Sequence, residues 1–294
     1  MANGIIIIDK PAGWTSMDVC AKLRGMFREK RVGHAGTLDP MATGVLPVFI
    51  GRATRAVEFA ADSDKEYIAG LKLGVVTNTQ DTTGEVLEER ECSVTRTELE
   101  AALSRFTGDI EQIPPMYSAI KINGKKLYEL ARKGREVERK PRSVTIHALE
   151  LLDVSPDGTS YRLRVVCSKG TYVRTLCHDI GQALGCGGCM SSLRRTKAAG
   201  FTLEDSVTLE AVQEAVDRGE GESLLLPVDV YFAGLPMLVL KNAEAEKKIR
   251  NGAALAARDV PEGEYRVYGA GKTFLALGWV ADNRLTTVKS FFEV

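Results

Sequence analysis

The sequence lacks several features that would place it in common classes of protein. No uninterrupted apolar run approaches the roughly 20 residues of a membrane-spanning helix. No basic residue precedes the four isoleucines at 5–8 and no small-residue cleavage site follows them, so a secretion signal is not expected. Those isoleucines instead predict a buried first strand. These absences argue against a helical membrane protein and against an exported one.

Cysteine is scarce and scattered. The six cysteines, at positions 20, 92, 167, 177, 186 and 189, form no framework of the kind that stabilises small secreted domains. We therefore expect free thiols in a reducing, cytoplasmic setting. The motif Cys186-Gly-Gly-Cys189 has the spacing of a redox or zinc pair, but no second pair completes four ligands. We expect a tight glycine-rich turn there and no metal.

Net charge is also lacking, because 39 Lys and Arg balance 39 Asp and Glu, and this by itself argues against a nucleic-acid partner. The charges are nevertheless segregated along the chain. Residues 121–142 hold nine Lys/Arg against three Glu, and residues 162–197 hold seven Lys/Arg against Asp179 alone. Residues 201–230 hold eight acids against one arginine. Such segregation would let one face bind a polyanion while the whole stays neutral, although an ordinary solvated surface remains the alternative.

Strand and helix patterns are intermixed without regular βαβ order. Alternation of apolar and polar residues around Tyr67 and again at 161–167 predicts strands. Apolar residues at helical spacing over 173–184 predict a helix. In the last 60 or so residues, short apolar runs separated by Gly, Asn and Asp predict a small all-β unit. The expected fold class is α+β with a largely antiparallel sheet, divided into domains of residues 1–233 and 234–294.

The segment at 33–46, GHAGTLDPMATGVL, gathers groups with chemical potential. Its three glycines let the backbone adopt positive φ and come close to a ligand, and Pro40 fixes the chain directly after Asp39. Asp39 is a single carboxylate among mostly uncharged residues, and such a group needs a nearby cation to stay ionised once buried. Composition alone leaves two interpretations open: a nucleophile, or an aspartate that merely begins a turn.

Together with Asp9-Lys-Pro-Ala-Gly-Trp-Thr-Ser16, this segment closely resembles the bacterial TruB family of tRNA pseudouridine synthases. Further stretches are similar to the family in the same order along the chain: Gln112-Ile-Pro-Pro-Met-Tyr-Ser-Ala119 with Asn123-Gly-Lys-Lys-Leu-Tyr128, Ser168-Lys-Gly-Thr-Tyr-Val-Arg-Thr175, and Leu193-Arg-Arg-Thr196. The resemblance covers about residues 4 to 230, and the remainder resembles the family only loosely. One departure is Gly-Gly-Cys189, where many relatives carry Gly-Ala-His.

The resemblance implies a pseudouridine synthase fold, in which a mixed, mostly antiparallel sheet carries an active-site cleft. A small C-terminal all-β PUA-like domain would bind RNA. The implied reaction is isomerisation of the uridine at position 55, in the TΨC loop of tRNA, to pseudouridine. No metal or organic cofactor is implied, in keeping with the absence of a P-loop, a dinucleotide fingerprint or a complete set of metal ligands. We expect a monomeric, cytoplasmic enzyme whose partner is the T stem-loop of tRNA.

The resemblance also implies three catalytic residues. Asp39 matches the family's nucleophile, which would attack the ribose C1′ or the uracil C6, or assist elimination to a glycal; the sequence does not choose among these routes. Arg174 matches the arginine that pairs with this aspartate and keeps it ionised. Tyr67 matches a tyrosine that stacks on the flipped uracil and is a candidate to take the departing proton. A core tyrosine and a surface arginine would give the same local patterns.

Other matched positions are implied to hold the substrate. Tyr172 and Leu193 match residues that line the base pocket, and His34 matches a histidine that takes the place of the flipped base in the RNA stack. Extruding a base from a folded loop costs a few kcal/mol of stacking, which binding energy must offset. Cationic side chains are the candidate phosphate contacts, and those we assign to RNA binding are Lys125, Lys126, Arg132, Lys133, Arg194 and Arg195.

Two alternatives from other classes remain open. An RNA-binding or RNA-folding module without required turnover could use the same cleft and C-terminal domain. A phosphotransferase with an aspartyl nucleophile is a second alternative, but it would need Mg²⁺ and further carboxylates, and no second acid stands within two residues of Asp39.

Overall fold

The first strand forms as the isoleucines predict. In the computed structural model, which describes residues 2–292, strand β1 (Gly4–Lys10) is buried along almost its whole length. It pairs antiparallel with β3 (Thr43–Ile50), which is equally apolar. Both faces of this pair are covered, which explains why the strands are continuous apolar runs rather than alternating ones.

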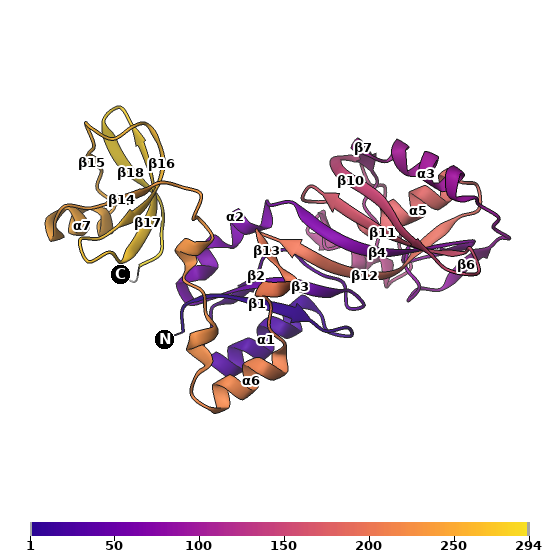
Figure 1. The fold of residues 1–294 in the computed structure, drawn as a ribbon, viewed down its shortest axis with the longest axis horizontal. Coiled ribbons are helices and arrows are strands. Elements are labelled where there is room, and N and C mark those ends of the chain that lie inside the picture. Colours follow the sequence, from indigo (N-terminus) through magenta and orange to yellow (C-terminus); the bar gives the residue numbers. More distant parts are fainter. Residues whose placement is uncertain (1, 293–294) are drawn as a thin grey trace.

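A nine-stranded sheet runs along most of the molecule (Figure 1). Its order is β1-β3-β12-β4-β11-β10-β7, with β2 added beside β3 and β13 beside β12. Among its pairs, β12 with β3 is parallel and the others are antiparallel. The predicted mixed, mostly antiparallel sheet is thus confirmed. The remaining strands are β2 (Val32–His34), β4 (Lys65–Leu73), β7 (Gly108–Gln112), β10 (Arg142–Val154), β11 (Ser160–Cys167), β12 (Gly188–Ala198) and β13 (Phe201–Thr202).

Helices cover the two halves of this sheet separately. Helices α1 (Ser16–Phe27) and α6 (Leu209–Asp217) pack on β1 and β3. Helices α3 (Arg96–Arg105) and α5 (Val173–Ala183) pack on β4, β10 and β11, while the short helix α2 (Val57–Ala61) lies near the end of β3. Over residues 2–292, none of the helices is both long enough and apolar enough to cross a membrane.

Two threonines act as the N-caps of helices α1 and α3. Thr15 and Thr95 each accept a hydrogen bond from the backbone N–H three residues later, and the acid at that position bonds back to the threonine N–H. The reciprocal bonds fix where α1 and α3 begin. For α1 this matters to the site described below, because its first residue, Ser16, contacts the loop that carries Asp39.

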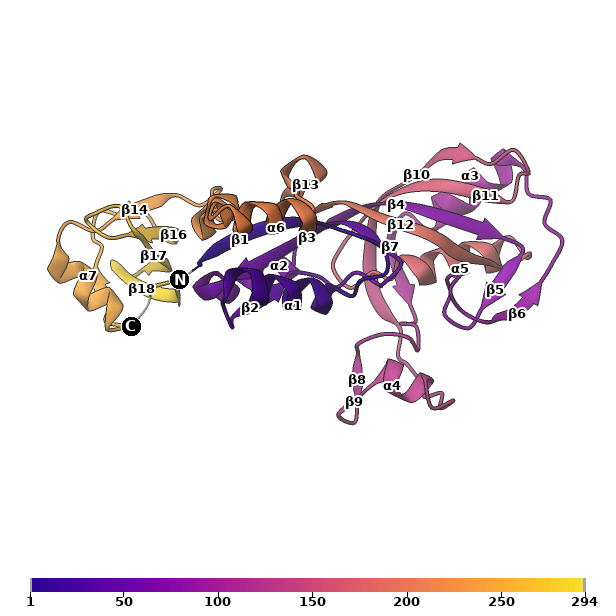
Figure 2. The same cartoon turned by 90° about the horizontal axis from the view of Figure 1, so that it is seen from below.

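Two small hairpins project from the main sheet. One consists of β5 (Val75–Thr77) and β6 (Val86–Glu89). The other consists of β8 (Lys121–Ile122) and β9 (Lys125–Lys126), followed by α4 (Leu127–Ala131). It belongs to a segment, the basic insertion (residues 113–141), that leaves the sheet after β7, returns at β10 and stands away from the rest of the molecule (Figure 2).

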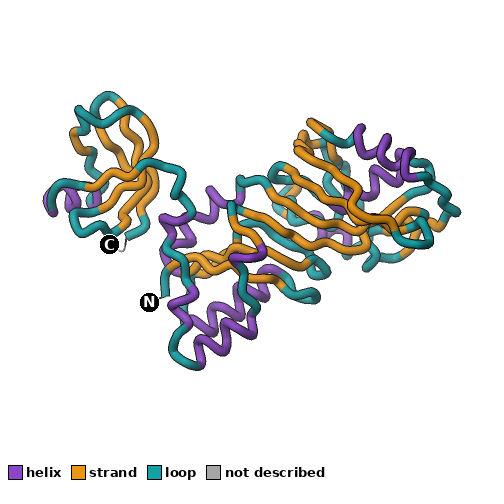
Figure 3. Tube along the Cα trace, in the orientation of Figure 1, coloured by secondary structure: helices purple, strands orange, loops and turns teal. Residues whose placement is uncertain are grey.

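The C-terminal part forms a second sheet (Figure 3). Its strand order is β14-β16-β17-β18-β15. The prediction of a small C-terminal all-β unit is confirmed, although the sequence interpretation missed one helix, which Asn242 caps. The elements are β14 (Met237–Val239), α7 (Ala243–Arg250), β15 (Leu255–Ala256), β16 (Gly263–Tyr268), β17 (Phe274–Ala281) and β18 (Arg284–Ser290).

An aromatic cluster joins the two sheets. Phe232, which follows the main sheet in sequence, packs against Phe274 and Phe291 of the C-terminal part, with ring centroids 6.4 and 5.7 Å apart. Lys289 of β18 also forms an ion pair with Glu58 of α2. Burial of several aromatic side chains contributes far more than one exposed ion pair. The cluster therefore holds the small sheet against the large one.

Candidate active site

Asp39 lies in the loop between β2 and β3, and the backbone around it is fastened from two sides. The Leu38 N–H donates to the hydroxyl oxygen of Ser16 at 2.9 Å, and that hydroxyl donates to the Leu38 carbonyl at 3.2 Å. The Gly13 N–H donates to the Pro40 carbonyl at 2.8 Å. The peptide units on either side of Asp39 are thus fixed, and its carboxylate has a defined position.

Lys10 fastens the same loop from inside. Its ammonium group donates to the carbonyls of Pro11 at 2.8 Å, Trp14 at 2.6 Å and Pro40 at 3.3 Å, and the residue is fully buried. Burial lowers the pKa of Lys10 to about 8, while the charge of Asp39 acts in the opposite direction. Lys10 therefore contributes positive charge behind the loop as well as hydrogen bonds.

Gly44 shows why the glycines of this segment are needed. Its φ is +101°, and a Cβ there would lie 2.2 Å from the carbonyl oxygen of Arg195. Any other residue would both strain the backbone and separate β3 from β12, which pair in parallel at this point. That pairing brings the loop with Asp39 next to the strand that carries Leu193.

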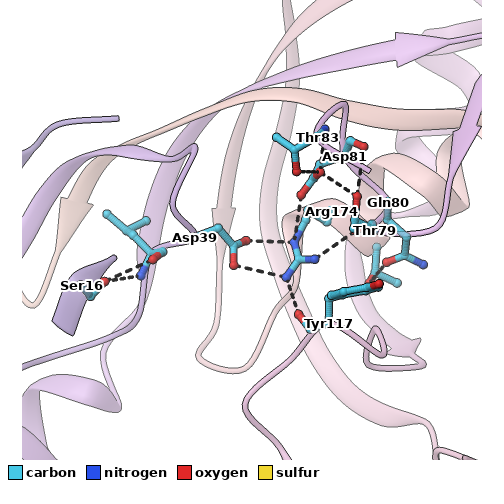
Figure 4. Close-up of polar contacts among 10 residues, drawn as sticks. Ser16, Asp39, Thr79, Gln80, Asp81, Thr83, Tyr117 and Arg174 are labelled. Carbon is cyan, nitrogen blue, oxygen red and sulfur yellow. Dashed lines mark hydrogen bonds and ion pairs between the residues drawn. The ribbon is translucent and has the colours of Figure 1, made fainter. Parts of the chain in front are cut away.

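Arg174, in the first turn of α5, meets Asp39 with two nitrogens (Figure 4). Its Nε lies 2.9 Å from Oδ2 of Asp39, and its Nη2 donates to Oδ1 at 3.3 Å. A two-pronged contact of this kind fixes the orientation of the carboxylate as well as its position. Only 6% of the Arg174 side chain is exposed, whereas 36% of the Asp39 side chain is. The arginine is therefore enclosed, and the carboxylate remains accessible to a substrate.

Further contacts hold Arg174 in place independently of Asp39. Its Nη1 donates to the Thr79 carbonyl at 3.0 Å and its Nη2 to the Tyr117 carbonyl at 2.8 Å. Asp81 lies 3.9 Å from its Nε and is itself held by the side chains of Thr79 and Thr83, at 2.8 and 2.6 Å. The guanidinium thus joins three segments of the chain. The two carbonyls carry no signal in the sequence, so sequence reasoning could not find them.

Tyr67 and Tyr172 lie within reach of the Asp39 charge. Burial raises the pKa of both phenols, and the negative charge of Asp39 acts in the same direction on each. Tyr67 is in β4, and it shares an apolar cluster with Leu38 and with Leu193 of β12. Both tyrosines are therefore neutral near pH 7 and present a ring face together with a hydroxyl. As neutral phenols they are poorly suited to accept a proton before the reaction begins.

His34, at the end of β2, is only partly exposed. Burial lowers the pKa of its imidazole, and the charge of Arg195 acts in the same direction. Its Nδ1 has no hydrogen-bond partner within the described part of the chain. His34 is thus a neutral ring near pH 7. Within residues 2–292, no hydrogen bond or ion pair joins its side chain to Asp39 or Arg174, and its place is fixed by the pairing of β2 with β3.

Four of the cationic residues assigned to RNA lie on the basic insertion. Lys125, Arg132 and Lys133 are exposed and Lys126 is partly exposed. The cations of Lys126 and Arg132 each lie 5.4 Å from the centre of the Tyr128 ring, which orders them by cation–π contact. The segment thus presents ordered positive charge on a projecting hairpin.

The two arginines of β12 differ from that group. Arg195 is 1% exposed, and its guanidinium donates to the carbonyls of Val45 at 2.7 Å and Gly36 at 3.1 Å. Its predicted contact with a phosphate is therefore corrected: Arg195 supports the Asp39 loop from beneath. Arg194 is partly exposed and forms a two-pronged ion pair with Asp9, at 2.8 and 3.1 Å.

The arginines on the polar side of β11 are also paired with acids. Arg164 pairs with Glu66 at 2.7 Å and with Glu150 at 2.9 Å, and Arg162 lies 3.6 Å from Asp153. Positive charge on this face of the sheet is therefore largely balanced locally. The cationic character that sequence counting gave to residues 162–197 is weaker in the folded protein than it is along the chain.

Cys186 and Cys189 separate at the predicted turn. Gly187 adopts a φ of +73° there, and Cys189 is buried in β12. The sulfur nearest to Cys186 belongs instead to Cys92, at 3.0 Å, and both thiols are free. No cluster of three or more His, Cys, Asp or Glu suited to a metal ion occurs among residues 2–292.

Two family models and several relatives match this sequence over most of its length. Residues 24–173 match the model of the TruB family pseudouridylate synthase N-terminal domain, and residues 174–233 match the tRNA pseudouridylate synthase B C-terminal domain. The tRNA pseudouridine synthase B of Pseudomonas putida (strain GB-1) is 47% identical over 96% of this chain and 92% of its own length. That of Clostridium kluyveri is 41% identical over 98% of this chain and 99% of its own.

Solved structures show the same architecture. A crystal structure of a Cbf5-Nop10-Gar1 complex contains a chain that superposes with a TM-score of 0.74 at 27% identity, covering 98% of this chain and 85% of that one. A second, of an H/ACA RNP bound to a substrate RNA containing 2′-deoxyuridine, gives a TM-score of 0.73 at 25% identity and covers 99% and 85%. The similarity extends over both sheets.

Proposed function

Because the chain belongs to the TruB family of pseudouridylate synthases and isomerises uridine to pseudouridine in tRNA, we propose that its target is the uridine of the TΨC loop, position 55, and that Asp39 is its nucleophile. One observation carries the assignment of Asp39 as nucleophile: an accessible carboxylate is held by two nitrogens of an enclosed arginine. The family alone does not say which residues of this chain perform the chemistry, and the pairing of Asp39 with Arg174 points to them.

The isomerisation sets the demands on the site. The bond between uracil N1 and ribose C1′ breaks, the base turns, and a bond forms between C5 and C1′. C5 then loses a proton and N1 gains one, so no electron donor or acceptor is consumed. A carboxylate that bonds transiently to the substrate divides this rearrangement into easier steps. Attack at C1′, attack at C6 and assisted elimination to a glycal all begin from the same position of Asp39.

Arg174 prepares Asp39 for this role. Moving a carboxylate from water into a site beneath a docked RNA disfavours its charged form, and the adjacent guanidinium offsets that cost. The two-pronged contact also aims the carboxylate, which limits the motion needed to reach the substrate. Because the Thr79 and Tyr117 carbonyls hold the guanidinium as well, it remains in place when Asp39 is engaged with the substrate.

The neighbouring side chains are suited to hold a detached base. We propose that Tyr67 stacks on the flipped uracil and that Tyr172 and Leu193 complete the walls of its pocket. Tyr67 and Leu193 share an apolar cluster with Leu38 of the Asp39 loop. Burial and, in the same direction, the charge of Asp39 raise the pKa of both Tyr67 and Tyr172, and the effect of that charge indicates that these two phenols lie near its carboxylate. Since the phenols are neutral, the pocket offers ring faces and hydroxyl donors rather than a second anion. A pocket of this kind can retain uracil while it turns.

Binding must supply the energy for base extrusion. The cations of the basic insertion, Lys125, Lys126, Arg132 and Lys133, are proposed to bind phosphates of the T stem-loop. Contact with the Tyr128 ring orders two of them, Lys126 and Arg132. The neutral ring of His34 is proposed to fill the gap that the flipped base leaves in the stack. RNA is then recognised by its shape and by one splayed-out base. Arg194, already paired with Asp9, contributes less than the four residues of the insertion.

The division into two domains, 1–233 and 234–294, is also a proposal. It is supported by the two separate sheets, which share no strand, and by the position of Phe232 at their junction. The first domain would contain all of the chemistry. The second, PUA-like domain would add grip on tRNA. We propose that a monomer suffices, because Asp39, Arg174, Tyr67 and Tyr172 all come from one chain, and that it works where tRNA is made, in the cytoplasm.

A substrate-position experiment tests the assignment of the target. Tritium release from tRNA labelled at uracil C5 reports the loss of the C5 proton at whichever uridine reacts. We expect release of about one label per tRNA, no release when U55 alone is replaced by C, and release at a similar rate from an isolated T stem-loop. The reaction is expected to proceed in EDTA. Release that persists in the U55C tRNA would contradict the proposed position.

A further inference from the structure

Gln112 has an unusual pair of contacts for a buried amide. It is the last residue of β7 and is 1% exposed. Its Oε1 accepts a hydrogen bond from the Tyr172 N–H at 3.0 Å, and its Nε2 donates to the Tyr172 carbonyl at 3.3 Å. Both ends of one side-chain amide thus bond the backbone of a single residue, 60 positions away in sequence.

The residue it holds stands at the start of α5. Tyr172 is the N-cap of this helix, its own side chain makes no capping bond, and its carbonyl accepts the first helical hydrogen bond from the Leu176 N–H at 3.0 Å. Two residues later the helix carries Arg174. The position of Tyr172 therefore sets both the direction of its own ring and the point from which the guanidinium leaves the helix.

Gln112 also marks the root of the basic insertion. The chain leaves the sheet directly after it, and Pro114 and Pro115, which lack a backbone N–H, cannot continue the strand ladder. Five residues beyond Gln112, the carbonyl of Tyr117 accepts from Arg174 at 2.8 Å. Gln112 and the first residues of the insertion thus contact the start of α5 twice, once through the Gln112 side chain and once through the Tyr117 backbone.

We propose that Gln112 is a positioning residue for the isomerisation: its amide clamps the backbone of Tyr172 and thereby places the Tyr172 ring and Arg174 for catalysis. This inference rests on the proposed function of that site. A glutamine is required because the clamp needs a donor and an acceptor at the same time, at the reach of this side chain. Asparagine is one methylene shorter, and glutamate in its ionised form has no donor.

A buried amide that merely satisfies its own hydrogen bonds is the alternative, and kinetics separate the two. Gln112→Ala, Gln112→Asn and Gln112→Glu are compared with Glu111→Gln, a change at the exposed neighbouring position of the same strand. Each is measured for single-turnover tritium release, for tRNA affinity and for thermal unfolding. We expect roughly a tenfold to hundredfold lower rate for the alanine and asparagine variants, since displacements of about 1 Å have effects of this size. Affinity and the rate of Glu111→Gln should stay within about threefold of the unaltered protein.

The glutamate variant provides a readout that a purely structural role would not move. A protonated carboxyl offers a donor and an acceptor, as the amide does, whereas the carboxylate would face the Tyr172 carbonyl without a donor. Burial against that carbonyl raises the pKa of an introduced carboxyl, while the charges of Arg142 and Arg174 lower it and those of Asp39 and Glu111 raise it. These charges set where the step lies. Its direction is fixed: the rate of Gln112→Glu relative to the unaltered protein should fall as pH rises from about 5 to 9.

The outcomes are distinct. Slower single turnover at unchanged tRNA affinity, with the pH-dependent loss in Gln112→Glu, supports the clamp. An unchanged rate in Gln112→Ala overturns it, as does a loss that matches the loss of folded protein and shows no pH step in Gln112→Glu. Weaker tRNA binding with a normal rate at saturation would make Gln112 a binding residue and also overturn the proposal. Failure of the unaltered protein to release tritium would contradict the proposed function itself, not the clamp alone.

Discussion

Replacing Arg174 with lysine keeps the positive charge but removes the fork that defines the site. The guanidinium makes two contacts with Asp39, at 2.9 and 3.3 Å, and two with the carbonyls of Thr79 and Tyr117, at 3.0 and 2.8 Å. A lysine ammonium is a single point on a flexible stem, and it can satisfy about two of these four acceptors at once. Arg174→Lys therefore separates the presence of a cation from its geometry.

The magnitude follows from the contacts that are lost. Two charge-assisted hydrogen bonds at about 1.5–3 kcal/mol each set an upper bound of about 3–6 kcal/mol. Because more than a third of the Asp39 side chain is exposed, solvent screening reduces this, and we expect the free energy of unfolding to fall by about 2–4 kcal/mol. Loss of aim at the carboxylate should slow catalysis roughly hundredfold, with little change in tRNA affinity.

Single-turnover tritium release and thermal unfolding measure the two effects on the same preparation. Arg164→Lys serves as the matched control, because Arg164 is also paired with two acids but lies on the face of β11 that the proposed chemistry does not use. The control should keep its rate within about threefold of the unaltered protein. If Arg174→Lys also kept its rate within threefold, the fork would have no part in preparing Asp39, and the reasoning from geometry to mechanism would be refuted.

Two further predictions concern binding and pH. Replacing Lys125, Lys126, Arg132 and Lys133 together with alanine should weaken tRNA binding and reduce the slope of log affinity against log salt by about 2–4. The single-turnover rate at saturating enzyme should be retained. An unchanged slope would show that the basic insertion makes no phosphate contacts. The pKa of Lys10 is about 8 in the folded protein and 10.5 in its ordinary, unfolded state. Between these pH values the unfolded protein therefore binds more protons at Lys10 than the folded protein does. As a result, the contribution of Lys10 to the free energy of unfolding rises with pH. The free energy of unfolding of the unaltered protein relative to Lys10→Met should therefore increase from pH 8 to 10.5, as measured by urea titration at several pH values, and a pH-independent difference would contradict the buried, loop-facing ammonium.

Much of the fold follows from local patterns in the sequence. Strands can be predicted from the isoleucines of β1 and from the alternation in β4 and β11. Helix starts can be predicted from the capping threonines at 15 and 95. Both kinds of pattern are informative because burial and capping are local requirements. Helix α7 was missed because its surface is mostly charged and its apolar side is short. The order of the strands in the sheet, and in particular the parallel contact of β12 with β3, depends on pairing across the whole chain.

The site was only partly predictable. The resemblance pointed to Asp39 and Arg174, and their ion pair was then found in the structure, but the carbonyls that hold Arg174 have no sequence signature. For Arg195 the sequence assigned a role in RNA binding that the structure does not support. Its neighbour Arg194 is partly exposed, and nothing in the sequence indicates that the Arg195 side chain points inward and bonds the carbonyls of Val45 and Gly36. Successive side chains of a strand point to opposite faces of the sheet, so Arg194 and Arg195 lie on different faces. Which of the two faces is buried depends on the register of the strand.

The central claim is that Asp39 is the nucleophile of the isomerisation and is not required for tRNA binding. Its most direct test is to measure tRNA affinity and single-turnover tritium release with Asp39→Asn, which removes the charge and keeps the size of the side chain. The account predicts affinity within about threefold of the unaltered protein and a rate lowered by at least about 10⁴-fold, as for loss of a nucleophile. An Asp39→Asn variant that converts tRNA at a tenth of the normal rate would contradict it, because the isomerisation would then proceed without the Asp39 carboxylate as nucleophile.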